Sequence, residues 1–319
     1  MPRRPALLWT LLLVCSSALA CSVPVFRYGL EHWAPDPYQI FVFHEAPLSA
    51  PKQTLLKQLS NTKHANLKVQ VINPASAPQE LRQLWERSSK PEVMVLGPPN
   101  FPTKGSLWTG ALSEADINTL LDSPVRQDIA QRLGSGDSAV WVLLESADKA
   151  ANDAAAKTLE QALQQAGETL ELPKLDDQDI KNGLVSVPDD GLRLTFPMIR
   201  LARDNPREAF LIRSLLSTEP DLKDVTGPIA FPIFGRGRVL YSLVGRGIKF
   251  DNVSEAARFL IGSCSCQIKE QNPGADLLIR VDWQKLLGTS TTLEELPTVD
   301  EIMKRKPILV PIPERKAKK

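Results

Sequence analysis

The chain has 319 residues, of which 43% are hydrophobic and 24% charged, with a formal net charge of +1. These values are ordinary for a globular protein, and the length allows two domains. The near balance of acids and bases gives no indication of a nucleic-acid partner, which a strongly basic chain would have suggested.

The first residues have the pattern of a secretory signal peptide. Arg3 and Arg4 give a positive start, residues 6–14 form an apolar run, and residues 18–20 (Ala-Leu-Ala) form a small-x-small cleavage site. The run is too short to span a bilayer comfortably. We therefore expect residues 1–20 to be removed and the protein to be exported to the periplasm or cell envelope.

Cys21 directly follows the expected cleavage site, and three hypotheses for it stay open. The segment resembles a bacterial lipobox, in which lipid on the cysteine anchors the protein to a membrane, although Ala18 and Leu19 stand in the reverse of the usual order. Ordinary cleavage after Ala20 would also leave Cys21 as the first residue. In the third hypothesis it is a working thiol at the start of a helix over residues 26–32, where the helix dipole favours the thiolate.

Cys264 and Cys266 are the other cysteines of the mature chain, since Cys15 leaves with the signal peptide. Two thiols alone are too few for a metal site, and the negative end of a helix that closes near Gly262 disfavours a thiolate. We expect either a disulfide from Cys21 to one of them or a buried thiol pair. A redox role remains the alternative, and no catalytic residue, metal ligand or cofactor is predicted.

The first half of the chain is predicted to alternate between strands and helices. Short apolar or alternating runs predict strands over residues 38–44, 67–72, 93–96 and 106–109. Helical patterns cover residues 52–59, 78–87, 113–121 and 123–134. Ser113 and Ser123 are suitable N-caps for the last two helices, and Pro124 suits the first helical position.

The second half is predicted to have the same order. Strands are expected at residues 139–144 and within 192–201, where Pro197 interrupts the run, and a hairpin is expected over 229–234 and 238–244. Helices are expected at residues 152–166, 205–216 and 252–262. Each half is thus strand, helix, strand, helix, strand, strand, helix. Helical crossovers require a parallel pair of strands, and the hairpin adds antiparallel strands, so we predict an α/β fold.

This order resembles the thioredoxin fold, present twice in tandem. The best local match is residues 226–245, in which Pro228 would correspond to the cis-proline before the third strand, Gly237 to the hairpin turn and Gly245 to the glycine before the last helix. The resemblance covers roughly residues 36–122 and 138–262. It implies two thioredoxin-like βαβαββα domains, over residues 21–135 and 136–290, followed by a Pro-rich basic tail over residues 291–319.

The chain departs from the thioredoxin pattern at the active site. Thioredoxins have Cys-x-x-Cys between the first strand and its helix, whereas the corresponding stretches here are residues 44–48 (His-Glu-Ala-Pro-Leu) and 145–149 (Glu-Ser-Ala-Asp-Lys). The resemblance therefore implies a redox-inactive scaffold that binds or supports a protein partner in the cell envelope. The loops over residues 97–105 and 175–190 are its expected recognition surfaces.

Two other functions stay open. The first is a thiol–disulfide protein that uses Cys264 and Cys266, with or without Cys21. The second is a hydrolase built around His44, which stands beside Glu45 at the end of a predicted strand.

Overall fold

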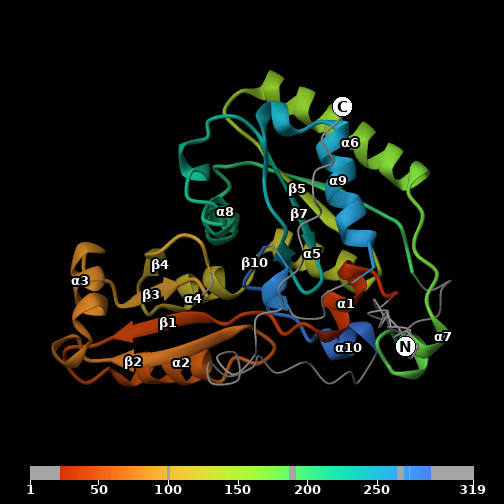
Figure 1. The fold of residues 1–319 in the computed structure, drawn as a ribbon. Helices are drawn as coiled ribbons and strands as arrows, with labels where there is room; N and C mark the ends of the chain where they lie inside the picture. Colours follow the sequence, from red (N-terminus) through yellow and green to blue (C-terminus); the bar gives the residue numbers. More distant parts are fainter. Residues whose placement is uncertain (1–21, 99–100, 187–191, 264–268, 273, 289–319) are drawn as a thin grey trace, which may run out of the picture.

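The computed structural model describes residues 22–98, 101–186, 192–263, 269–272 and 274–288. It is a mixed α/β protein with a four-stranded sheet in the first half of the chain and a six-stranded sheet in the second, as Figure 1 shows. Within these residues, no helix is both long and apolar enough to cross a membrane.

The first sheet has the strand order β2-β1-β3-β4. Its strands are β1 (Tyr38–Phe43), β2 (Leu67–Ile72), β3 (Val93–Leu96) and β4 (Ser106–Gly110). Strand β1 runs parallel to β2 and antiparallel to β3, which in turn is antiparallel to β4. The connecting helices are α2 (Ala50–Ser60), α3 (Gln79–Arg87) and α4 (Glu114–Leu121).

The two faces of the first sheet bury alternate residues of β1, as the period of a strand requires. Ile40 and Val42 face a core that includes Leu59 of α2 and Leu120 of α4. The opposite face carries a small apolar cluster, which consists of Phe41, Phe43, Met94 and Trp85 of α3.

The second sheet has the order β10-β8-β7-β5-β6, and β9 also pairs with β7. Its strands are β5 (Val140–Leu144), β6 (Met198–Leu201), β7 (Ile229–Phe234), β8 (Arg238–Val239), β9 (Leu243–Val244) and β10 (Ala275–Asp276). Strand β5 is parallel to β6 and antiparallel to β7, and β7 is antiparallel to β8. The first four strands of each half are therefore arranged in the same order and directions.

Helices cover both faces of the second sheet (Figure 1). On one face, α6 (Lys149–Thr169) and α9 (Phe250–Ile261) pack against residues such as Trp141. On the other, α5 (Pro124–Gly134) and α8 (Ala209–Leu216) pack against residues such as Phe231. The short helices α7 (Asp177–Lys181) and α10 (Trp283–Leu287) complete the second half, with single turns that include η6 (Lys269–Gln271).

The predicted α/β class and the order of strands and helices in both halves are confirmed. Two strands are shorter than expected. Strand β6 begins only after Pro197, whose carbonyl accepts a hydrogen bond from the Trp141 N–H (2.8 Å). The expected strand over residues 238–244 is divided into β8 and β9, and Leu240 between them donates to the Pro232 carbonyl (3.0 Å).

The helix predicted near residues 26–32 is present as α1 (Val25–His32), but it packs on the second sheet. Its residues Phe26 and Tyr28 are 2% and 1% exposed and belong to the core beneath α6 and α9. The Val25 N–H donates to the Gly262 carbonyl (3.1 Å) at the end of α9. The core of the second half therefore includes a segment that precedes the first sheet.

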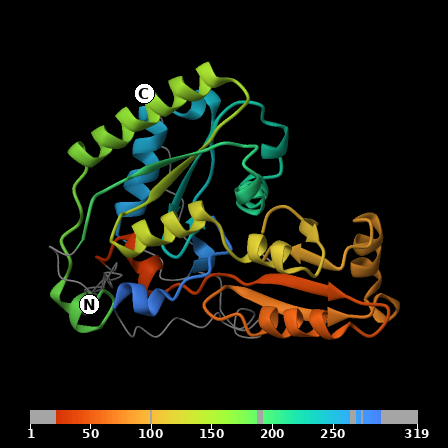
Figure 2. The same cartoon turned by 180° about the vertical axis from the view of Figure 1, so that it is seen from behind.

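Helix α5 joins the two halves, and Figure 2 shows α4 and α5 following one another across the junction. Its Arg126 is 1% exposed and donates to the carbonyls of Thr119 (2.9 Å) and Leu120 (2.9 Å) at the end of α4, and of Leu278 (3.2 Å). The guanidinium also lies over the Phe210 ring of α8. Burial lowers the pKa of Arg126 to about 10, so the side chain remains charged at neutral pH.

The resemblance was wrong about Pro228. All peptide bonds of the described residues are trans, including the bond that precedes Pro228. Arg203 holds this turn by donating to the carbonyls of Val225 (2.6 Å) and Gly227 (3.1 Å), and the Pro228 carbonyl accepts from the Gly245 N–H (3.0 Å). These bonds fix the entry into β7 with the isomer that is intrinsically favoured before proline.

Candidate functional site

The first candidate site is an open hollow of about 350 Å³ at the end of β1, here called the β1 hollow. The end of β1, the start of α2 and the loop before β3 surround it. Its lining residues include His44, Glu45, Lys52, Trp85, Lys90 and Glu92. The hollow therefore includes residues 44–48, which follow the first strand and contain no cysteine.

Ion pairs and hydrogen bonds hold the side chains of the β1 hollow. Lys52 of α2 forms an ion pair with Glu92, which also accepts a hydrogen bond from the Leu112 N–H (2.9 Å). The Lys52 hydrogen bond, together with that from Leu112, lowers the pKa of Glu92. The Lys90 ammonium lies 5.6 Å from the centre of the Trp85 ring. The hollow thus presents fixed charges of both signs around an aromatic ring.

His44 of the β1 hollow makes its described contact within its own turn. His44 Nδ1 lies 3.2 Å from the Ala46 carbonyl oxygen, within its own turn. A histidine that activates a nucleophile instead requires a hydroxyl or thiol at hydrogen-bond distance. The geometry around His44 therefore favours a turn-stabilising role over general-base catalysis.

The corresponding position of the second half lies between β5 and α6 and is a capped helix start. Asp148 accepts a hydrogen bond from the Ala151 N–H (3.0 Å), which satisfies one of the free donors of α6. On the adjoining surface, Arg200 pairs with Glu145 (2.5 Å) and Asp153 (2.7 Å). These contacts are structural, and no described residue at this position offers a thiol.

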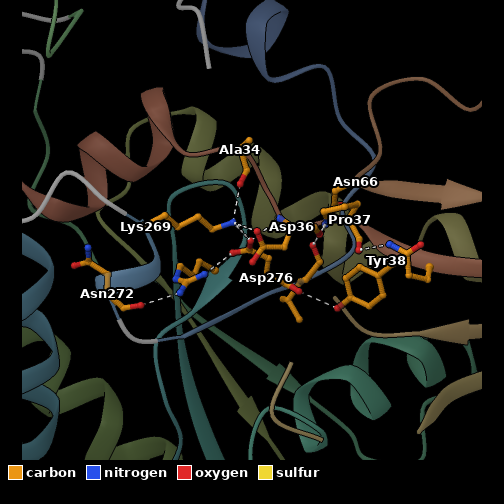
Figure 3. A network of polar contacts seen from close by, with 11 residues as sticks. Ala34, Asp36, Pro37, Tyr38, Asn66, Lys269, Asn272 and Asp276 are labelled. Atoms are coloured by element: carbon orange, nitrogen blue, oxygen red, sulfur yellow. Dashed lines mark hydrogen bonds and ion pairs between the residues drawn. The ribbon is translucent and has the colours of Figure 1, made fainter. Parts of the chain in front are cut away.

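The second candidate site is a buried cluster of four charged residues, here called the charged junction, shown in Figure 3. It consists of Asp36, Arg238, Lys269 and Asp276, which are 8%, 6%, 6% and 3% exposed. Lys269 pairs with Asp36 (2.7 Å) and Asp276, and Arg238 pairs with Asp276 (3.2 Å). Two cations thus offset two carboxylates in a region largely shielded from water.

The charged junction connects the two halves of the protein. Asp36 lies just before β1 of the first sheet, whereas Arg238, Lys269 and Asp276 belong to β8, η6 and β10 of the second half. The Asp36 N–H donates to the Asp276 carboxylate (2.7 Å), and the hydroxyl of Tyr38 donates to the Asp276 carbonyl (2.9 Å). Figure 3 shows the Lys269 ammonium pointing toward both carboxylates.

The two carboxylates of the charged junction differ in their electrostatics. Burial, reinforced by the charge of Asp276, raises the pKa of Asp36. Burial also disfavours the charged form of Asp276, but Lys269 and Arg238 together outweigh it and lower the pKa of that carboxyl. Asp276 is therefore the anion on which both cations depend.

A hollow of about 340 Å³ borders the charged junction. Its lining includes residues that belong to the hydrophobic core. Phe101, which lines it, is 2% exposed and packs into the first core. Across the described ranges, no group of three or more histidine, cysteine, aspartate or glutamate side chains could hold a metal ion. The contacts that the charged junction makes between the two halves indicate a role in stability.

Sequence reasoning did not find the charged junction. Its members are separated by more than two hundred residues between Asp36 and Arg238, and no spacing motif connects them. The only sequence feature that could have indicated it is the opposite charge of Lys269 and Asp276, seven residues apart near the end of the second half. That spacing alone does not predict a buried ion pair.

The two loops expected to bind a partner are packed where they are described. In the first, the Thr103 hydroxyl donates to the Ser217 carbonyl (2.7 Å). In the second, Val185 is 2% exposed, and the Asp179 carboxylate accepts from the N–H of Ser22 (2.7 Å). These contacts tie parts of both loops to the body of the protein. Most of the second stretch is nevertheless exposed, including Ile180 of α7 at 39%.

The candidate thiols Cys21, Cys264 and Cys266 lie outside the described residues. Their described neighbours lie side by side, because Pro24 and Ser263 form an antiparallel bridge. The chain therefore brings the segment that follows Cys21 next to the segment that precedes Cys264.

Comparison of the chain with protein-family models and with curated proteins finds no match. Its function is therefore argued from its own residues.

Proposed function

We propose that this protein is an exported cell-envelope protein with two redox-inactive thioredoxin-like domains that bind or support a protein partner. The observation that carries the proposal is the end of the first strand in each half. Residues 44–48 and 145–149 stand where a thioredoxin has its thiols, and neither stretch contains cysteine. The shared strand order of the two sheets supports the thioredoxin-like assignment.

The β1 hollow is the proposed recognition surface. It is open to solvent and presents Lys52, Lys90, Glu45 and Glu92 around Trp85. Charges of both signs at the rim of a hollow can orient a partner of complementary charge. The partner would contribute a mixed-charge surface, since Trp85 itself is only 7% exposed and belongs to the core.

Site-specific photo-crosslinking in the native host tests this function. We expect a photoreactive residue at Glu45, on the rim of the hollow, to form a discrete adduct with one envelope protein. The same residue at Lys149, an exposed residue of the corresponding stretch in the second half, is the control and should give no adduct. A failure of the Glu45 probe, or turnover of a disulfide substrate by the purified protein, would contradict the proposal.

A thiol–disulfide function is the second candidate. It is favoured by the Pro24–Ser263 bridge, which brings the segments next to Cys21 and Cys264 together. If this function holds, the Cys264→Ser and Cys266→Ser variants lose disulfide exchange with a model substrate. Exchange that persists in both variants would exclude it.

The state of Cys21 is decided by the intact mass of the mature protein from its host, after alkylation of free thiols without reduction. A lipid-sized gain in mass supports membrane anchoring through Cys21. An unlipidated mass with fewer alkyl groups than the three thiols indicates a disulfide.

A further inference from the structure

Strand β2 is an outer edge of the first sheet, with β1 on its other side (Figure 1). The Asn66 carbonyl accepts a hydrogen bond from the Tyr38 N–H of β1 (2.9 Å). The Ile72 carbonyl accepts one from the His44 N–H (3.1 Å). Since successive residues of a strand point their backbone groups to opposite sides, the even-numbered residues of β2 bond to β1. The odd-numbered residues 67, 69 and 71 therefore direct their backbone groups away from the sheet.

A further strand would pair with this edge at two residues. The Leu67 N–H already donates to the Ala65 carbonyl (3.0 Å), so pairing begins at Val69. Val71 is 46% exposed, the most exposed large hydrophobic residue of the described chain. In an antiparallel pair, two directly opposed residues exchange both of their backbone hydrogen bonds. A strand beside Val69 and Val71 would therefore form a short hydrogen-bonded ladder and cover the Val71 side chain.

The other sheet edges are less suited to such an addition. Strand β4, the opposite edge of the first sheet, contacts α8 of the second half. The Thr103 hydroxyl before β4 also donates to the Ser217 carbonyl after α8 (2.7 Å). On β6, an edge of the second sheet, Arg200 is engaged by Glu145 and Asp153. Of the two edges of the first sheet, β2 is therefore the one that a partner can reach.

The surroundings of the β2 edge are basic. Residues 46–79 contain four lysines and no aspartate or glutamate. Lys57 lies in the last turn of α2, Lys63 in the connection from α2 to β2 and Lys68 within β2, and all three are exposed. Of the four lysines, only Lys52 has an ion-pair partner within the described part of the chain. The edge therefore lies in a region of uncompensated positive charge.

This positive charge determines which occupant fits the edge. A lysine on an edge strand discourages pairing with a second copy of the same edge, because like charges repel. An acidic strand instead gains from Lys68. At the start of β2, Arg280 and Asp282 add one charge of each sign and leave the excess of positive charge unchanged.

We propose that β2 is a docking edge for an extended acidic segment of a partner protein, which adds to the first sheet as a fifth strand. A directly opposed residue places its side chain on the same face as its partner. Aliphatic residues opposite Val69 and Val71 therefore lie on the face that α2 covers. The residues between them lie on the face of Lys68, where acidic side chains are favoured. The proposal does not rest on the β1 hollow.

Hydrogen exchange of the full mature chain, followed by NMR, tests the proposal with a short synthetic peptide that alternates glutamate and valine. At saturating peptide, we expect the amides of Val69 and Val71 to exchange about tenfold or more slowly than in the free protein. The Leu67 amide should be unchanged, because it is already bonded to Ala65. Unchanged exchange at Trp141 in β5 confirms that the fold is intact.

Matched peptides and variants separate strand pairing from simple attraction between charges. Methylation of the valine amides removes the N–H groups that would bond to β2, whereas methylation of the glutamate amides removes N–H groups that would face solvent. We expect only the first to abolish protection. Lys68→Glu should weaken binding of the unmethylated peptide by about threefold to tenfold. Lys157→Glu, at an exposed residue of α6, is the control and should leave binding unchanged.

Unchanged exchange at Val69 and Val71 with the unmethylated peptide would overturn the proposal. Equal protection by the peptide methylated on its valines would mean that the lysines attract any anionic chain, and it would exclude pairing with the edge. Protection of both amides without peptide that rises with protein concentration would show that a second copy occupies the edge instead of an acidic partner.

Discussion

The two halves of the protein share one strand order but differ in how deeply their strands are buried. In the second half, every residue of β5 and β7 is buried, and helices cover both faces of the sheet. In the first half, the equivalent central strands β1 and β3 each keep one residue only partly buried, and α2 and α3 each bury only one residue. The same arrangement of strands thus supports two cores of different size.

The difference indicates that the second half contributes most of the stability. It also recruits α1 from the N-terminal side of the first sheet and α5 from its C-terminal side. The first half is held to the second by the hydrogen bonds of Arg126 and by the ion pairs of the charged junction. Substitutions in matched positions of the two halves should therefore have unequal effects.

The largest effect is expected from core truncation in the second half. Phe231 is fully buried, and Phe231→Ala should lower the free energy of unfolding by about 3–5 kcal/mol, because apolar burial is lost and a cavity remains. Phe41→Ala makes the same change in the small cluster of the first half and should cost less, because that cluster has only four buried residues. Urea denaturation followed by circular dichroism measures both, and equal losses would refute the difference between the cores.

The next largest effect is expected at the charged junction. Asp276→Asn leaves Lys269 and Arg238 without their shared anion and should lower the free energy of unfolding by about 3–5 kcal/mol. Asp36→Asn should have a smaller effect at pH 7, because Lys269 keeps Asp276 as a partner and the raised pKa of Asp36 makes its charged form unfavourable.

The pH dependence of unfolding separates these two carboxylates. The pKa of Asp276 is lowered on folding, so its stabilisation is present above the ordinary aspartate range and is lost as the pH falls through that range. The pKa of Asp36 is raised, so its contribution is most favourable at low pH and is lost as the pH rises through the raised value. The Asp276→Asn deficit should therefore shrink below about pH 4. A deficit independent of pH would show that the charge is not responsible.

A disulfide between Cys21 and Cys264 or Cys266 would strengthen the second half alone. It would tie α1 to the end of α9, whose neighbouring residues Pro24 and Ser263 already form a bridge. If it forms, we expect reduction to lower the free energy of unfolding by about 2–4 kcal/mol. Unfolding curves of the unlipidated protein with and without reductant measure this, and a Cys21→Ser variant should be insensitive to reductant.

The smallest effect is expected at the rim of the β1 hollow. Glu92→Gln should lower the free energy of unfolding by less than about 1 kcal/mol, because the Lys52–Glu92 pair is partly exposed to water. The lowered pKa of Glu92 means that this contribution is present above the ordinary glutamate range and is lost as the pH falls through the folded value. NMR titration of the Glu92 carboxyl should give a value below 4.5, and the Lys52→Ala variant should raise it.

The periodicity of the chain was sufficient to predict most of the fold. Apolar runs such as residues 140–144 and capping residues such as Ser113 act locally, so their positions specify strands and helix starts without tertiary information. The sequence also shows directly that residues 44–48 and 145–149 contain no cysteine. The breaks at Pro197 and between β8 and β9 depend on single residues within a run, where periodicity gives poor boundaries.

The α/β class, the order of the elements and the lack of thiols at both strand ends could all be predicted from the sequence. The structure was needed to show that α1 completes the second core, that the bond before Pro228 is trans, and that Asp36 meets Lys269 and Asp276. Strands and helices follow from patterns between neighbouring residues. Packing partners and buried ion pairs instead join residues that are distant in the chain, so they arise only when the sheets have come together.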